Sequence, residues 1–215
     1  MQQIIILGGN NVPGQIMARH LLTSGLHVTV FADADDDLKI SHHNYHYIKG
    51  DVFNIHSVTQ AIAGYDAVVS VYSSYYLSRL LYLRDGLQNI ILSMKENNIS
   101  RFIFFNFSDD VYPSIRINIV ATFFKKFLGI DYDKKIKLMN ESSVIKSGLI
   151  YTINSLEQIF LRRGPDNRIS DLMKKYYFFL ADELLKQLLE DKDINKVVKL
   201  KFGNGLNDQV LSQAV

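Results

Sequence analysis

The sequence contains no cysteine among its 215 residues. Disulfide bonds, thiolate metal sites and a cysteine nucleophile are therefore excluded, and the composition fits a reducing compartment. An excess of charge of one sign is also lacking, because 24 lysines and arginines are balanced by 22 acidic residues and leave a net charge of +2. Since the basic residues are scattered along the chain, neither a nucleic-acid nor a membrane partner is indicated.

Long apolar runs and prolines are scarce as well. The first apolar run ends at Gly8 and follows Met1-Gln2-Gln3, which has no basic residue. We therefore expect neither a signal peptide nor a membrane span, and we expect a cytoplasmic protein. The three prolines, at positions 13, 113 and 165, interrupt no predicted strand or helix. With 47% hydrophobic residues, the chain is expected to form one domain over residues 1–215.

Strand and helix patterns alternate along the chain. Apolar, β-branched runs predict strands at 4–7, 27–31, 45–49, 67–71, 102–105, 149–153 and 197–200. Segments with helical spacing lie between them, at 15–24, 58–62, 80–94, 136–145 and 184–189. This order predicts an α/β fold, with a doubly wound, mostly parallel sheet and helices on both faces.

Two aromatic stretches, 108–135 and 162–180, lack clear periodicity. In a doubly wound domain such late insertions usually cover the ligand crevice, so we expect residues 1–110 to form a nucleotide-binding half and 111–215 a substrate-side half. Core packing is expected for the block 176–179, and Ala181-Asp182 behind it is expected to begin a helix. The residues from Gly203 onward are expected to form a loosely held tail.

The turn between the first predicted strand and helix reads Gly8-Gly9-Asn10-Asn11-Val12-Pro13-Gly14. A strand that turns tightly into a helix aims backbone N–H groups and the positive end of the helix dipole at one point, where a pyrophosphate can bind. Glycine is needed there because a Cβ would collide with the phosphates or the strand. Gln15-Ile16 replace the Lys and Ser or Thr of a P-loop, which argues against a nucleoside-triphosphatase.

Further motifs follow the turn at regular offsets: Leu21-Leu22-x-x-Gly25, Gly50-Asp51-Val52 and Ala63-Gly64-x-Asp66-Ala67. Together with the turn, this run resembles the atypical short-chain dehydrogenase/reductase family, in particular its NmrA-like and NADH-flavin-reductase-like members. The resemblance covers roughly the first half of the chain. It implies a Rossmann-like fold and a bound NAD(P).

By this resemblance Gly8, Val12 and Gly14 would contact the pyrophosphate, together with Asn10 and Asn11. The family's turn usually reads Gly-Ala-Thr/Ser-Gly-x-x-Gly, so the two asparagines replace the hydroxyl residue and the middle glycine. Asparagine tolerates a left-handed backbone, so the turn can survive, but its side chain takes space where the pyrophosphate approaches. A turn that no longer holds any cofactor is therefore the alternative.

Asp33 follows the second predicted strand, where an acid can hydrogen-bond both ribose hydroxyls of NAD. A 2′-phosphate would be repelled by this carboxylate and by Asp35, Asp36 and Asp37, so NAD(H) is favoured over NADP(H). For the last three aspartates, a solvated loop or a helix start is the simpler interpretation.

Other positions match cofactor-lining residues of the family. Asp51 and Val52 correspond to the residues against the adenine, and Ser70, Tyr72 and Ser73 stand where small residues often line the cofactor's path. Alternatively, Gly50-Asp51 ends a strand and caps the helix that begins near residue 54. The aromatic cluster that continues through residues 75, 76 and 82 can pack over a planar ligand or form a subunit contact in a homodimer.

Candidate catalytic residues are Lys137 and Ser108. Many reductases and epimerases of the family carry Tyr-x-x-x-Lys, in which the lysine lowers the pKa of the tyrosine and holds the ribose. Counting back from Glu141 places Lys137 at the lysine, but Asp133 stands at the tyrosine, with Tyr132 beside it. Ser108 follows the fifth predicted strand, where a Ser or Thr commonly faces the nicotinamide. For both residues a purely structural role is the alternative.

Together with these residues, the resemblance implies an NAD(P)-binding oxidoreductase that transfers hydride from NADH to a small planar acceptor such as a flavin or quinone. A non-catalytic, NmrA-like dinucleotide sensor is the alternative, favoured by the missing tyrosine and by Ser155-Leu156 in place of the family's Arg-Pro. Nucleotide-sugar epimerisation ranks third because it needs the tyrosine. His42-His43-x-x-His46 has no convincingly placed carboxylate, so no metal site is predicted.

Overall fold

A computed structural model of the protein describes residues 2–36, 40–72, 79–106, 132–156, 171–201 and 209–214. Eight strands form one sheet in the order β3-β2-β1-β4-β5-β6-β7-β8. The strands are β1 (Gln3–Leu7), β2 (His27–Ala32), β3 (Tyr45–Lys49), β4 (Ala67–Ser70), β5 (Arg101–Asn106), β6 (Ile150–Leu156), β7 (Lys196–Lys201) and β8 (Gln209–Ala214). All neighbours pair in parallel except β7 and β8, which pair antiparallel. The predicted doubly wound, mostly parallel sheet is confirmed.

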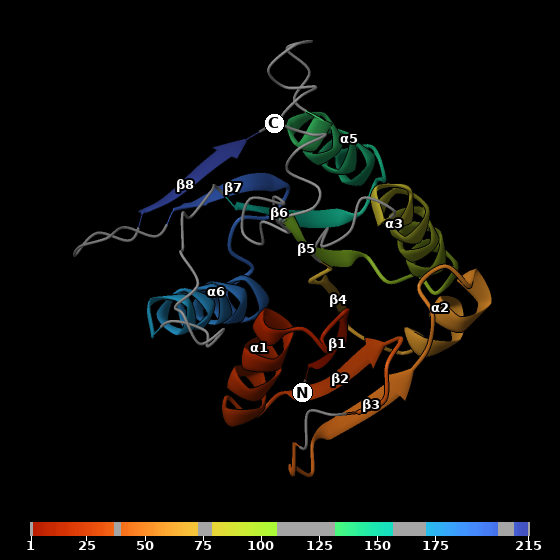
Figure 1. Cartoon of the computed structure of the whole chain (residues 1–215), viewed down its shortest axis with the longest axis vertical. Helices are drawn as coiled ribbons and strands as arrows, with labels where there is room; N and C mark the ends of the chain where they lie inside the picture. The colour runs from red at the N-terminus through yellow and green to blue at the C-terminus, as the bar shows by residue number, and fades with distance from the viewer. Residues whose placement is uncertain are drawn as a thin grey trace, which may run out of the picture.

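Helices cover both faces of this sheet (Figure 1). They are α1 (Val12–Thr23), α2 (Ile55–Ala61), α3 (Arg79–Glu96), α5 (Tyr132–Ile145) and α6 (Asp171–Leu189). Helices α1 and α6 pack together on one face, whereas α3 contacts both α2 and α5 on the other. The connection from β1 through α1 to β2 therefore lies on the opposite face from α3, as in a doubly wound domain.

The core consists of two apolar clusters, one on each face of the sheet. Ile4 and Ile6 of β1 belong to the cluster beneath α1 and α6, whereas Ile5 and Leu7 belong to the cluster beneath α2 and α3. All four side chains are fully buried because successive residues of a strand point to opposite faces. An uninterrupted apolar run is therefore the correct pattern for a strand with helices on both sides.

Two expectations about the second half were wrong. The tail is not loosely held along its whole length, because β8 continues the sheet and pairs along β7, which would otherwise present an open edge. Ala181-Asp182 does not begin a helix but lies within α6, which starts at Asp171. The aromatic block at the start of α6 hides its helical period. Core packing is confirmed for Tyr176 and Tyr177, which are fully buried, but it is wrong for Phe178, whose side chain is exposed.

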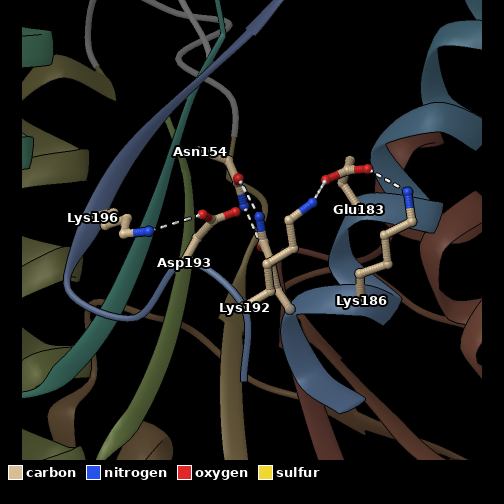
Figure 2. Close-up of polar contacts among 7 residues, drawn as sticks. Asn154, Glu183, Lys186, Lys192, Asp193 and Lys196 are labelled. Atoms are coloured by element: carbon tan, nitrogen blue, oxygen red, sulfur yellow. Dashed lines mark hydrogen bonds and ion pairs between the residues drawn. The ribbon is translucent and has the colours of Figure 1, made fainter. Parts of the chain in front are cut away.

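Two separate groups of polar contacts lie on the α6 side of the sheet, one between Asn154 of β6 and Gln187 of α6 and the other around Glu183 of α6 (Figure 2). The amides of Asn154 and Gln187 exchange two hydrogen bonds, of 2.9 and 2.8 Å, and both side chains are fully buried. The nearly buried carboxylate of Glu183 accepts from Lys186 at 2.6 Å and from Lys192 at 3.3 Å. The hydrogen bond to Glu183 raises the pKa of Lys186. These pairings satisfy polar groups that would otherwise destabilise the interior.

Candidate functional site

The glycine turn joins β1 to α1 at the carboxyl end of the sheet. Gly8 has a φ of +78°, which side-chain-bearing residues rarely adopt. A Cβ on Gly14 would lie 2.5 Å from Gly9 Cα, so the start of α1 sits directly against the backbone of the turn. Only glycine at position 14 allows an approach this close. The turn therefore has the tightness that the sequence predicted.

Asn11 occupies the N-cap of α1. Its Oδ1 accepts a hydrogen bond of 2.8 Å from Gly14 N–H, and its Nδ2 donates one of 2.7 Å to Val71 O, just beyond the end of β4. Its φ of −81° is extended, and neither asparagine adopts the left-handed backbone that asparagine would tolerate. The turn survives because a capping side chain satisfies one of the orphan amides of the helix.

This cap changes what α1 can offer to an anion. The Gly14 amide is engaged by Asn11 and Pro13 has no N–H, so two of the first-turn positions supply no free donor. Asn10, next to the cap, accepts through its backbone oxygen from Gln15 Nε2 at 3.1 Å. A phosphate at the N-terminus of α1 would therefore be held mainly by the helix dipole and by a hydrogen bond from the amide of Val12.

Tyr72 lies over the first glycine of the turn. A Cβ on Gly8 would lie 2.8 Å from Tyr72 Cδ1, so the absence of a side chain at Gly8 makes room for the tyrosine ring. The half-buried ring also borders a small, mostly apolar hollow on the face covered by α3. The hollow is lined by Val52, Ser70, Tyr72, Gly86, Leu87, Ile90 and Phe104. Three predicted cofactor residues thus border one space: Val52 follows β3, and Ser70 and Tyr72 lie at and just beyond the end of β4.

The acidic loop after β2 divides into residues with and without partners. Asp33 is exposed and makes no hydrogen bond or ion pair within the described part of the chain. Asp35 Oδ1 accepts from Lys49 Nζ at 2.7 Å, and Asp36 Oδ1 accepts from the Tyr45 hydroxyl at 3.1 Å. Burial, followed by the charge of Asp36, raises the pKa of Tyr45. Asp37 lies outside the described residues.

Asp51 and Val52 have different environments although they are neighbours. The Asp51 carboxylate is exposed and accepts from Phe53 N–H at 2.9 Å, whereas Val52 is buried and lines the hollow. Helix α2 is capped by Asn54, whose Oδ1 accepts from Ser57 N–H at 3.2 Å. The alternative in which Asp51 caps this helix is therefore wrong.

Lys137 lies on α5, away from the glycine turn, at the carboxyl ends of β5 and β6. Its Nζ donates to Leu156 O, the last residue of β6, at 2.8 Å. Asn106, the last residue of β5, is buried and donates through Nδ2 to Lys137 O and to Glu141 Oε1, both at 3.1 Å. Asn106 and Glu141 thus fix α5 against the sheet where the substrate side is expected.

Sequence reasoning did not select Asn106 or Glu141 as site residues, although Asn106 lies two residues before Ser108 and Glu141 was used to locate Lys137. A polar residue that ends a buried strand at the carboxyl edge was the available signal. The other predicted residues of this region, Ser73 and Ser108, lie outside the described residues. The same holds for Tyr75 and Tyr76 of the aromatic cluster.

The described histidines do not gather into a metal centre. His42 and His43 stack on each other with ring centroids 4.6 Å apart, and His42 Nδ1 accepts from Asn44 N–H at 3.2 Å. Within the described ranges, no group of three or more His, Cys, Asp or Glu side chains is placed to hold a metal ion.

Among the helices of the described ranges, none combines the length and apolar character needed to cross a bilayer.

The sequence matches the model of a family described as NAD(P)H-binding over residues 8 to 167. This match covers more than half of the chain, from the glycine turn to beyond β6. The chain belongs to the NAD(P)H-binding family. No curated protein matches the sequence.

Solved structures of this fold resemble the chain over nearly its whole length. A Rossmann-fold NAD(P)-binding family protein from Shigella flexneri has a TM-score of 0.64 at 20% identity and covers 97% of this chain and 98% of its own. The oxidoreductase ylbE from Lactococcus lactis has a TM-score of 0.68 at 18% identity, and the match covers 94% of this chain and 91% of ylbE. A candidate NADH-flavin reductase from Streptococcus pneumoniae has a TM-score of 0.64 at 15% identity, and the match covers 93% of this chain and 98% of the reductase. At these identities the likeness shows a Rossmann-like fold.

Proposed function

We propose that this member of the NAD(P)H-binding family is a reductase that binds NADH and transfers hydride to a small planar acceptor, such as a flavin or a quinone. The observation that carries the proposal is the exposed carboxylate of Asp33, directly after β2, which has no partner among the described residues. It lies beside a glycine turn whose close contact between Gly9 and Gly14 only glycine at position 14 allows. In this fold a dinucleotide lies across these two features, with its pyrophosphate at the helix and its adenosine ribose at the acid.

Most of the predicted residues have a role in this proposal. Asp33 would accept from the ribose hydroxyls, Val12 would donate its amide to the pyrophosphate, and Val52 would pack against the adenine beside Asp51. Ser70 and Tyr72 would line the path toward the nicotinamide, and Ser73 would continue it. Residues 1–110 would thereby supply the nucleotide half of a single domain. The cofactor would supply the hydride chemistry.

Residues 111–215 would supply the substrate side. Lys137 would donate a hydrogen bond from the mouth of the site, since its ammonium lies at the ends of β5 and β6. Asn106 and Glu141 would position it through α5. Ser108, after β5, would contact the nicotinamide or the acceptor. No proton-donating tyrosine is needed for hydride transfer to a flavin or quinone, which the orientation of the two rings and exclusion of water can promote.

Calorimetric titration with NADH and NADPH tests the assignment of Asp33. We expect NADH to bind about tenfold more tightly than NADPH, because the carboxylate accepts from the 2′-hydroxyl and repels a 2′-phosphate. Asp33→Ala is expected to remove most of this difference. Glu96→Ala, at the exposed end of α3, is the charge-matched control and should leave both affinities unchanged. Equal affinity of the unaltered protein for the two dinucleotides would rule out this role.

Asn11→Gly tests whether the capping side chain restricts the pyrophosphate. The change is expected to tighten NADH binding severalfold, because it frees Gly14 N–H and opens the space of the middle glycine. It is also expected to lower the free energy of unfolding by about 1 kcal/mol, because the bond to Val71 O is lost. Calorimetry and urea unfolding measure the two effects. Weaker binding in the variant would show that Asn11 is instead part of the anion site.

A dinucleotide sensor without turnover is the second candidate. The Asn11 cap and the Tyr72 ring over Gly8 favour it, because both place side chains along the path that a cofactor would take. Oxidation of NADH, followed at 340 nm with flavins and quinones as acceptors, separates the two functions. A protein that binds NADH but oxidises it with none of them fits the sensor. Binding of neither dinucleotide would exclude both forms of the proposal.

A further inference from the structure

Three residues of β3 hold the acidic loop that follows β2. Tyr45, Tyr47 and Lys49 are spaced by two and therefore point to the same face of the strand. They contact consecutive loop residues: Tyr45 reaches Asp36, Lys49 reaches Asp35, and the Tyr47 hydroxyl donates to Ala34 O at 2.6 Å. The backbone position of the loop is therefore determined by an edge strand.

This face of β3 is the one that carries the start of α1. Tyr45 and Tyr47 pack against the same core cluster as Val12 and Ile16 of α1. The last residue of β3, Lys49, pairs in register with Ala32, which directly precedes Asp33. A ribose held by Asp33 in front of α1 would therefore have Lys49 among its nearest cations.

The chemistry of this lysine suits the feature that distinguishes NADPH from NADH. A lysine ammonium binds phosphate as a point charge, and the 2′-phosphate is the only phosphate that NADPH has and NADH lacks. The Lys49 ammonium is engaged by Asp35 at 2.7 Å. The side chains are 59% and 84% exposed, so the pair is weak and a single substitution releases the lysine.

We infer that the Lys49–Asp35 pair is a selector for the dinucleotide: Asp35 withholds Lys49 from the 2′-phosphate and thereby adds to the preference for NADH that Asp33 establishes. This inference rests on the proposed function, because it requires that a dinucleotide binds at Asp33. It assigns the two aspartates different tasks. Asp33 accepts hydrogen bonds from the ribose hydroxyls directly, whereas Asp35 acts by forming an ion pair with Lys49. The arrangement makes Lys49 a specificity-determining residue.

A double-mutant cycle separates the lysine from the simple loss of a negative charge. We expect Asp35→Ala to strengthen NADPH binding about fivefold, with NADH affinity changed less than about twofold. Lys49→Met alone should alter NADPH affinity less than about twofold, because the lysine is already engaged. In the double variant Asp35→Ala/Lys49→Met, most of this gain in NADPH affinity should disappear. Titration calorimetry with both dinucleotides measures all four proteins, and the non-additivity in NADPH affinity is the diagnostic quantity.

Glu190→Ala, beyond the exposed end of α6, removes the same charge far from the loop and is expected to leave the NADPH affinity unchanged. If Lys49→Met changed the NADPH affinity equally with and without Asp35, the selector would be overturned while the proposed function stayed intact. The same would follow if the double variant bound NADPH as tightly as Asp35→Ala does. Failure of the unaltered protein to bind either dinucleotide would overturn both. Circular dichroism of each variant verifies that the loop substitutions leave the fold unchanged.

Discussion

Gly14→Ala is expected to lower the free energy of unfolding by about 3 kcal/mol and to abolish dinucleotide binding. The added Cβ would lie 2.5 Å from Gly9 Cα and 2.8 Å from Gly9 O. Because both neighbours are backbone atoms, no side-chain rotation can relieve the collision, and α1 must move away from the turn. The Asn11 cap and the amide of Val12 would move with it. Urea unfolding and NADH titration measure the two losses.

Gly64→Ala separates this steric effect from a general sensitivity to substitution of glycine. Gly64 has a φ of +84°, but an added Cβ would meet nothing within 4 Å, so alanine there is strained without a collision. We expect a loss of about 1 kcal/mol in stability and unchanged affinity for NADH. If Gly14→Ala lost no more stability than Gly64→Ala and still bound NADH, the close approach of α1 to the turn would not be what the protein requires.

Asn154→Leu is expected to destabilise the protein by about 3 kcal/mol, the second large effect. The substitution removes both bonds of the amide pair and leaves the fully buried Gln187 side chain without its partner. An unsatisfied buried amide is more costly than the loss of the bonds alone, since water cannot replace them. Urea denaturation should show a lower midpoint with an unchanged dependence on denaturant.

Restoring an apolar pair tests the mechanism of that loss. The double variant Asn154→Leu/Gln187→Met replaces both amides by apolar side chains and is expected to recover at least half of the stability lost by Asn154→Leu. Because the pair joins β6 to α6 on the side of the sheet away from Lys137, NADH binding should remain normal in both variants. A double variant as unstable as the sum of its single substitutions would show that packing, not the unsatisfied amide, is responsible.

The sequence predicted the regions in which local pattern and tertiary environment agree. The run at Ile4 to Leu7 is apolar at every position, and burial between two helical layers requires that pattern. Glycine at positions 8 and 14 indicated a tight turn, and the structure contains one. The second half was harder to predict from the sequence. The aromatic residues in the first half of α6 hide the helical spacing of its apolar residues, and β8 has only a modest apolar pattern of its own. That strand pairs with β7 through backbone groups, which any sequence carries.

The sequence allowed candidate site residues to be selected, but it could not predict which groups they contact. Asp33 was selected because it follows a predicted strand, where an acid can bind a ribose, whereas Asp51 and Ser70 were selected by resemblance to the family. That Asn11 reaches Val71 could not be inferred, since the two lie 60 residues apart and meet only because β1 and β4 are neighbours. The same adjacency brings Tyr72 over Gly8.

The amino-acid sequence by itself therefore determined the family, the class of fold and the place of the glycine turn, because these depend on short-range spacing of glycine and apolar residues. The tertiary structure alone decided which groups remain available to a ligand. It engages the Gly14 amide with Asn11 and Asp35 with Lys49, and it leaves Asp33 without a partner among the described residues. The reason is physical: a hydrogen bond or an ion pair depends on distance in space, and strand order, which sequence spacing does not specify, sets that distance.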